Sequence, residues 1–218
     1  MTRKQSRIPG AMMFAILAGL AVTLTIPVSA GEYNQVANIG DPMPEFSDLP
    51  STDGGTLSSS DLTEDVVVLV FLANHCPWVQ GMDRDLINLV DEMKGRSVRF
   101  VGINVNHRED DRLPAMKVHG EKVGYNFTYV FDESQETGRK LGAARTPEYF
   151  VFNKDRKLVY MGLLHNSPAS MRGDGSVSYT KGEPTQHYVR DAILATLEGK
   201  PVPVQETRSH GCNVEYEQ

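Results

Sequence analysis

The chain has 218 residues, of which 40% are hydrophobic and 23% are charged. This size fits one globular domain and leaves no room for a second large one. The formal net charge is -6, which excludes a general nucleic-acid binder, because phosphate groups must be neutralised by Lys or Arg. The chain contains only two cysteines, too few for a scaffold held together by disulfides.

Residues 1–30 have the pattern of a secretory signal peptide. Basic residues near the start precede an uncharged, largely apolar stretch over 11–26, and small residues follow up to Ala30. The apolar stretch is short for a membrane span. We therefore expect cleavage near Ala30, no stable membrane span after cleavage, and a periplasmic or secreted protein in an oxidising compartment. An uncleaved membrane anchor is the alternative.

After the predicted signal peptide, the sequence indicates a short strand over 45–49 and a hairpin turn over 52–56. Val66–Leu72 is an unbroken apolar and mostly β-branched run, typical of a strand buried on both faces of a sheet. An amphipathic helix follows, for which Pro77 suits the first position and Gly95 the end. The thiol of Cys76 lies between this strand and this helix.

The later elements also alternate. We expect, in chain order, a strand over 98–105, a helical insertion over 109–124, an extended segment over 127–131, a helix over 133–141, strands over 149–152 and 158–161, a long loop over 166–184, a helix over 183–197 and an extended tail. This order predicts an α/β fold in three layers. The expected segments are a signal peptide (1–30), one domain (31–200) and a tail carrying Cys212 (201–218).

Cys76 is the strongest candidate for a reactive group. A thiol at a helix N-terminus meets the positive end of the helix dipole and unpaired N–H groups, which stabilise its thiolate form. Thiolate is the nucleophile in disulfide exchange and in peroxide reduction. His75 can add positive charge when it is protonated. The alternative is a buried, inert cysteine that ends the strand.

The stretch from Val67 to Val79, with the motif Asn-His-Cys-Pro-Trp-Val at its end, resembles the strand and active-site turn of thioredoxins. It resembles more closely a peroxiredoxin-like branch of the redoxin families, which includes alkyl hydroperoxide reductase and thiol-specific antioxidant proteins. The resemblance continues at Thr146–Pro147 and at Gly211–Cys212. It implies a thioredoxin-like three-layer α/β/α sandwich with a central mixed sheet.

The resemblance also implies roles for individual residues. Thr146 and Pro147 match the cis-proline loop, which in the family faces the active cysteine and pairs with an extended substrate. His75, Pro77 and Trp78 flank the thiol and are further candidates for substrate binding. Trp78 has the alternative role of covering the first helical turn. The bond before Pro147 has the alternative of an ordinary trans peptide.

Several departures from the family bear on function. Val79 replaces the second cysteine of thioredoxins, so no local disulfide can form. Ala73 stands where peroxiredoxins have a threonine, and Pro147 aligns with their helper arginine. Arg145 is close to that position in the sequence, but the sequence does not say where it points. The features that specialise either branch are therefore missing around Cys76.

Cys212 is the candidate resolving cysteine, because it is the only other thiol in the chain. Three states remain open: a redox-cycling pair with Cys76, a static disulfide, and two unpaired thiols. A permanent link would stabilise the fold by about 4 to 5 kcal/mol through loop closure. His75 and His210 accompany the two cysteines, but the spacing is not that of a metal site, so we expect no metal and no cofactor.

Two functions follow from these observations. The first is an exported, peroxiredoxin-like thiol oxidoreductase with antioxidant activity, in which Cys76 attacks a peroxide or a disulfide of a protein or small molecule, and Cys212 or an external thiol reductant completes the cycle. The second is a non-catalytic binding module of the same fold, with a static Cys76–Cys212 disulfide or idle thiols.

Overall fold

The computed structural model describes residues 1–2 and 31–218. The predicted signal peptide and its cleavage site fall on residues outside this described part. Within the described part, no helix combines the length and the apolar character that a membrane crossing requires.

A five-stranded mixed sheet forms the centre of the fold, with the strand order β5-β4-β3-β7-β8. The central strand β3 (Val66–Phe71) runs parallel to β4 (Val98–Asn104) and antiparallel to β7 (Glu148–Phe152). The sheet is completed by β5 (Thr128–Phe131), parallel to β4, and by β8 (Leu158–Gly162), antiparallel to β7. This arrangement confirms the predicted central mixed sheet.

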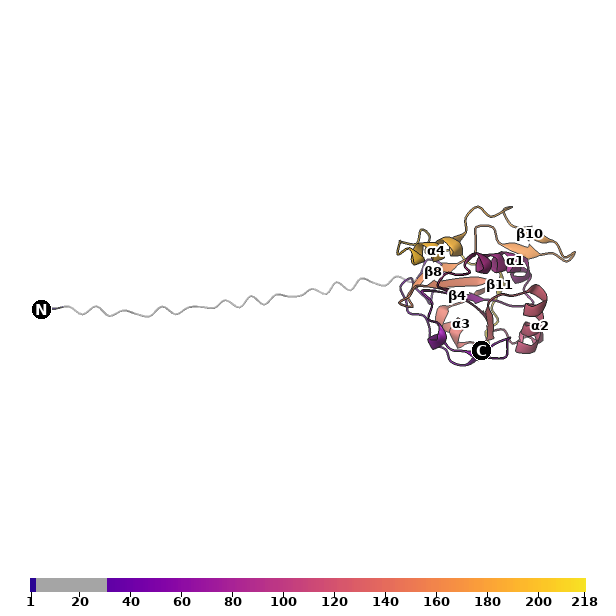
Figure 1. Cartoon of the computed structure of the whole chain (residues 1–218), viewed down its shortest axis with the longest axis horizontal. Coiled ribbons are helices and arrows are strands. Elements are labelled where there is room, and N and C mark those ends of the chain that lie inside the picture. Colours follow the sequence, from indigo (N-terminus) through magenta and orange to yellow (C-terminus); the bar gives the residue numbers. More distant parts are fainter. Residues whose placement is uncertain (3–30) are drawn as a thin grey trace.

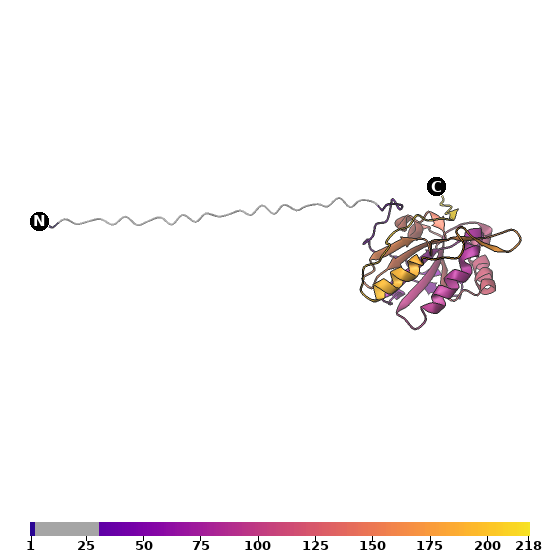
Figure 2. The same ribbon diagram turned by 90° about the horizontal axis from the view of Figure 1, so that it is seen from above.

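Helices cover both faces of the sheet (Figure 1). The helices α1 (Pro77–Glu92) and α4 (Tyr188–Leu197) lie side by side on one face, as Figure 2 shows, and α3 (Glu136–Leu141) lies on the other. Successive residues of β3 alternate between the two apolar cores, so the whole strand is buried. The α/β/α sandwich is therefore confirmed, and the unbroken apolar run in its central strand is explained.

The segment over 109–124 contains a short 3-10 turn, η2 (Glu109–Asp111), and then α2 (Leu113–Val123), which packs beside β5. Pro114 begins this helix rather than interrupting it. At the N-terminal side, β1 (Leu49–Pro50) pairs with β2 (Thr56–Leu57), so the predicted turn between them is confirmed and the predicted strand is shorter and later. A 3-10 turn, η1 (Ser59–Asp61), follows.

The prediction of a long loop over 166–184 is wrong in part. This segment contains an antiparallel hairpin of β9 (Ala169–Met171) and β10 (Val177–Tyr179), which packs on α1. Gly81 allows the close packing, because a Cβ atom there would lie 2.5 Å from the Cα of Ser170. The sequence hides the hairpin, since its strands are short and half exposed and lie among Gly and Ser residues.

The tail after α4 folds back along the domain. It first follows β8, where the main-chain N–H of Thr207 donates to the carbonyl of Met161 over 3.1 Å. Farther on, β11 (Cys212–Asn213) pairs antiparallel with β6 (Arg145–Thr146), and Cys212 lies opposite Thr146. The tail therefore pairs with two segments of the domain and brings the second cysteine to the loop before Pro147.

Candidate redox site

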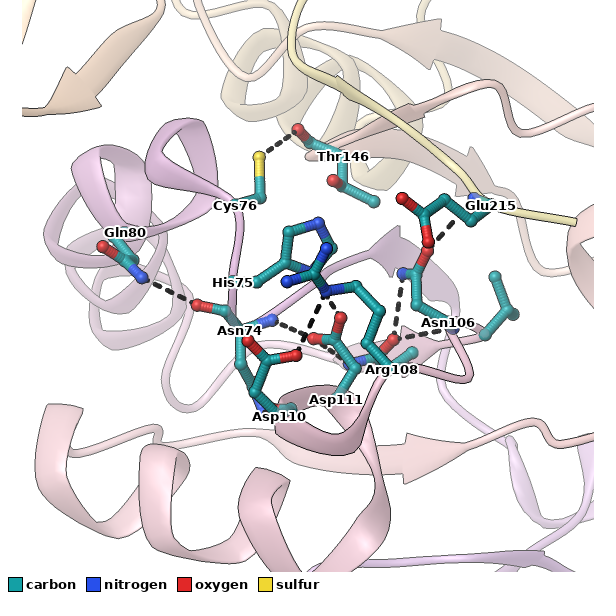
Figure 3. Close-up of polar contacts among 12 residues, drawn as sticks. Asn74, His75, Cys76, Gln80, Asn106, Arg108, Asp110, Asp111, Thr146 and Glu215 are labelled. Carbon is teal, nitrogen blue, oxygen red and sulfur yellow. Dashed lines mark hydrogen bonds and ion pairs between the residues drawn. The ribbon is translucent and has the colours of Figure 1, made fainter.

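Cys76 is the N-cap residue of α1, and Pro77 occupies the first helical turn. The sulfur therefore lies at the N-terminus of the helix, as the sequence predicts. Its thiol donates a hydrogen bond to the carbonyl of Thr146 over 3.2 Å (Figure 3). The side chain is also fully buried, with 0% of its surface exposed. Cys76 thus lies at a position that favours its thiolate, but it is shielded from solvent. The sequence alone does not reveal this burial.

The peptide bond between Thr146 and Pro147 is cis, so the cis-proline prediction is confirmed. The loop contacts the active-site turn through the main chain, because the carbonyl of Thr146 accepts the hydrogen bond from Cys76. The Oγ1 atom of Thr146 is buried and has no hydrogen-bond partner in the part of the chain that the structure describes. One polar atom beside the thiol is therefore available to a further group.

Cys212 reaches the same place from the tail. Cys212 lies opposite Thr146, whose carbonyl accepts the thiol of Cys76, and the ring of His210 in the tail packs on Trp78 in the first turn of α1. Burial, and after it the neighbouring thiol of Cys76, raise the pKa of Cys212 to about 12. Both cysteines are free thiols in the structure. Two sulfurs therefore share the start of one helix, and Cys212 keeps its proton at neutral pH.

Gly211 makes this approach possible. Its φ of +154° lies in a region that favours glycine. A Cβ atom at this position would lie 2.0 Å from the carbonyl oxygen of Thr146 and 2.8 Å from its carbonyl carbon. Since both are main-chain atoms, no side-chain movement could relieve the contact. The resemblance singled out Gly211 together with Cys212, and the structure gives the physical reason for the glycine.

Hydrogen bonds hold the tail on both sides of Cys212. After the cysteine, the N–H of Val214 donates to Ala144 over 3.1 Å, and the hydroxyl of Tyr216 donates to Ala143 over 2.7 Å. Before it, the hydroxyl of Ser209 donates to Glu148 over 2.6 Å. The tail therefore forms a closed strap over the thiol of Cys76.

A buried polar network lies behind the active-site turn (Figure 3). The carboxylate of Asp111 is fully buried and accepts hydrogen bonds from the N–H of Asn74 over 2.6 Å and from Asn104 over 3.1 Å. It also binds Nδ1 of His75. This contact fixes the ring of His75 beside Cys76. The sequence does not single out Asp111, because the run of acids over 109–111 gives no sign that one of them turns inward.

The same cluster contains the only group of potential metal ligands found among the described residues: His75, Asp110 and Asp111. The oxygens of Asp111 already accept three hydrogen bonds, and Asp110 pairs with Arg108 over 3.2 Å. These contacts account for the donor atoms, so we assign no metal to this cluster.

The remaining predicted residues lie around the thiols. Pro77 is exposed at the start of α1, and Trp78 is half buried. The ring of Trp78 packs edge to face on His210 of the tail, with 4.2 Å between ring centroids. Val79 is buried in the core. The guanidinium of Arg145 hydrogen-bonds Asn213 and the carbonyl of Gly211, so it holds the tail.

Comparisons with known proteins agree with this architecture. The family model named Redoxin matches residues 38–175. None of the curated proteins compared with the chain is similar to it.

Solved structures provide further matches. An uncharacterized conserved protein from Geobacillus kaustophilus is 33% identical, with a TM-score of 0.73, over 83% of this chain and 93% of its own. A hypothetical protein from Sinorhizobium meliloti is 26% identical, with a TM-score of 0.72, over 83% and 96%. A putative thiol:disulfide interchange protein from Chlorobium tepidum is 25% identical, with a TM-score of 0.53, over 73% and 98%. By its sequence match and its architecture, this chain belongs to the redoxin family and has the thioredoxin-like fold.

Proposed function

We propose that the protein is an exported thiol–disulfide oxidoreductase in which Cys76 is the nucleophile and Cys212 is the resolving cysteine. The observation that carries this proposal is that both cysteines meet at Thr146: Cys212 lies opposite it in the strand pair, and its carbonyl accepts the thiol of Cys76 at the N-terminus of α1. A helix N-terminus stabilises a thiolate, and a second thiol in contact can displace a bound partner. The similarity to a putative thiol:disulfide interchange protein supports the same chemistry.

The reaction consists of two exchanges. The thiolate of Cys76 attacks one sulfur of a substrate disulfide, the S–S bond breaks, and the other substrate sulfur leaves as a thiolate. Cys212 then loses its proton and attacks the sulfur of Cys76 in the mixed disulfide, which releases the second substrate thiolate. The substrate gains two electrons, and the protein is left with a Cys76–Cys212 disulfide. An external thiol reductant must return it to the reduced form.

The chemical state of Cys76 affects the pKa of the Cys212 thiol. In the reduced protein, burial and, after it, the neighbouring Cys76 raise the pKa of Cys212. When Cys76 is bonded to a substrate sulfur, it can no longer carry a negative charge, and this contribution disappears. Cys212 therefore becomes easier to deprotonate at the step in which it must attack.

The buried position of Cys76 requires the tail to open before a substrate can bind. Opening separates β11 from β6, which frees the main chain of Thr146. The unpartnered Oγ1 of Thr146 lies at the same place and can bond a polar group of the substrate. Thr146 and Pro147 thus position the substrate in this proposal, with His75, Pro77 and Trp78 around the thiol.

Peroxide is the other substrate class that the sequence suggests. Ala73 and Pro147 supply neither the threonine hydroxyl nor the arginine that would hold a peroxide. A substrate disulfide needs only the thiolate and the resolving thiol, both of which this site contains. The site residues therefore favour a disulfide over a peroxide.

The test is to measure reduction of a protein disulfide, of a small-molecule disulfide and of hydrogen peroxide by three purified proteins: wild type, Cys76→Ser and Cys212→Ser. We expect Cys76→Ser to lose every activity and Cys212→Ser to accumulate a mixed disulfide on Cys76, visible by mass spectrometry. Unchanged activity in Cys76→Ser would rule out the proposal and leave the non-catalytic binding module. Activity confined to peroxide would move the substrate assignment to that class.

Export is the second part of the proposal, and it rests on the pattern of residues 1–30. Expression of the full chain in a bacterial host, followed by N-terminal sequencing of the product, tests it. We expect a mature protein that begins near Gly31. A product that keeps residues 1–30 would contradict cleavage near Ala30.

A further inference from the structure

A cavity of about 540 Å³ opens beside the tail and ends one residue from Cys212. Its walls come from β6, from the segment 163–181 and from residues 208–211 of the tail. The volume is in the range typical of small-molecule sites. The cavity therefore lies next to the proposed redox pair without containing either sulfur.

The charges along this cavity are all of one sign. Its lining includes the basic residues Arg145, Lys181, Arg208 and His210, and no Asp or Glu. This is unusual for a chain that contains 28 acidic and 22 basic residues. We call it the basic cavity. Such a concentration of positive charge attracts an anionic ligand.

Two of these charged side chains form no ion pair within the described part of the chain. The side chains of Lys181 and Arg208 take part in none of its ion pairs or hydrogen bonds. The nearby carboxylate of Glu148 is buried, accepts the hydroxyl of Ser209, and does not line the cavity. The two cations are thus available to bind carboxylate groups of a ligand.

We propose that the basic cavity binds a low-molecular-weight thiol with carboxylate groups, which reduces the Cys76–Cys212 disulfide. This inference rests on the proposed function, since it names the class of the external reductant. A small molecule fits better than a protein partner, because β11 already occupies the pairing edge of β6. An extended polypeptide would find no free strand edge beside Cys212 while the tail is closed.

The reduction proceeds through two thiol exchanges. The bound thiolate attacks Cys212, which is half buried, whereas Cys76 is fully buried. The protein S–S bond breaks, and Cys76 leaves as a thiolate at the N-terminus of α1. A second molecule of the thiol attacks the mixed disulfide on Cys212. The two small thiols are oxidised to their disulfide, and both protein cysteines are reduced.

Binding is tested first with S-methylglutathione, which carries two carboxylates but has no thiol that could exchange. We expect calorimetry to show binding to the wild-type protein that weakens about five-fold or more in Lys181→Ala/Arg208→Ala. The matched control is Lys117→Ala/Lys122→Ala, which removes two exposed positive charges from α2. Equal binding to both double variants overturns the proposal.

Reduction is tested next on the oxidised protein. We expect 3-mercaptopropionate to be favoured over the neutral 2-mercaptoethanol, after correction for their rates with a small disulfide, and Lys181→Ala/Arg208→Ala to lose this preference. The preference should shrink in high salt, which screens charge. If S-methylglutathione binds selectively but 3-mercaptopropionate reduces the protein no better than 2-mercaptoethanol, the assignment of a reductant site is overturned. If S-methylglutathione binds selectively but the protein forms no Cys76–Cys212 disulfide, the proposed function is refuted instead. The two results can be separated because the calorimetry involves no redox step.

Discussion

Gly211→Ala tests the tail as a closed strap over Cys76. The added Cβ atom would lie 2.0 Å from the carbonyl oxygen of Thr146 and 3.4 Å from the nitrogen of Pro147. Because these are main-chain atoms, the tail must move, and it loses its pairing with β6. Two main-chain hydrogen bonds at about 1 kcal/mol each give a loss of about 2 kcal/mol. At about 1.4 kcal/mol for each factor of ten, the open tail becomes about 30-fold more populated.

The rate of alkylation of Cys76 measures this opening. We expect iodoacetamide to modify Cys76 about 30-fold faster after Gly211→Ala, if opening precedes the reaction. Both proteins carry Cys212→Ser, so that Cys76 is the single thiol, and mass spectrometry follows the product. The control is Gly173→Ala, because a Cβ atom at residue 173 has no neighbour within 4 Å.

The expected effect is local. Far-UV circular dichroism and the urea midpoint should show that the Gly211→Ala protein remains folded, since the five-stranded sheet does not include the tail. Equal alkylation rates in folded Gly211→Ala and its parent would refute the conclusion that the tail limits access to Cys76.

Three further predictions concern buried groups. Asp111→Ala leaves the buried N–H of Asn74 without its acceptor, so we expect about 2 kcal/mol of destabilisation by urea unfolding, whereas exposed Glu121→Ala should change little. Burial raises the pKa of Glu148 above its usual value of 4.5. The folded protein then binds this proton more tightly than the unfolded chain, so stability falls as pH rises from 4.5 through the raised value. This loss should be absent in Glu148→Gln, and a constant difference between the two proteins from pH 4 to 8 would contradict it. Since the pKa of Cys212 is about 12, its alkylation in the reduced protein should still accelerate above pH 10, and a plateau near pH 9 would show an ordinary thiol.

The elements around the nucleophile could be predicted because their signals are local. The apolar run of β3 and the amphipathic pattern of α1 each specify their own structure, and Pro77 marks the point where one becomes the other. The position of Cys76 at a helix start follows from these neighbours. The cis bond before Pro147 was implied by the family resemblance rather than by the residues themselves.

The rest of the site depends on contacts between distant parts of the chain. His75 and Asp111 come from different segments, and no periodicity links them. The closeness of Cys212 depends on the pairing of β11 with β6, two strands too short to be recognised in a sequence. For this reason both thiols could be nominated from the sequence, but their meeting at Thr146 could not.

The most direct test of a redox pair is the equilibrium between the two cysteines in buffers of defined thiol–disulfide ratio. Trapping of the free thiols, digestion and mass spectrometry give the fraction of protein with a Cys76–Cys212 disulfide at each ratio. We predict a fully formed disulfide in oxidising buffer, and the same midpoint when the titration is repeated from the reduced and from the oxidised protein in the absence of denaturant. Free thiols at every ratio, or a disulfide that is reduced only in denaturant, would contradict the account.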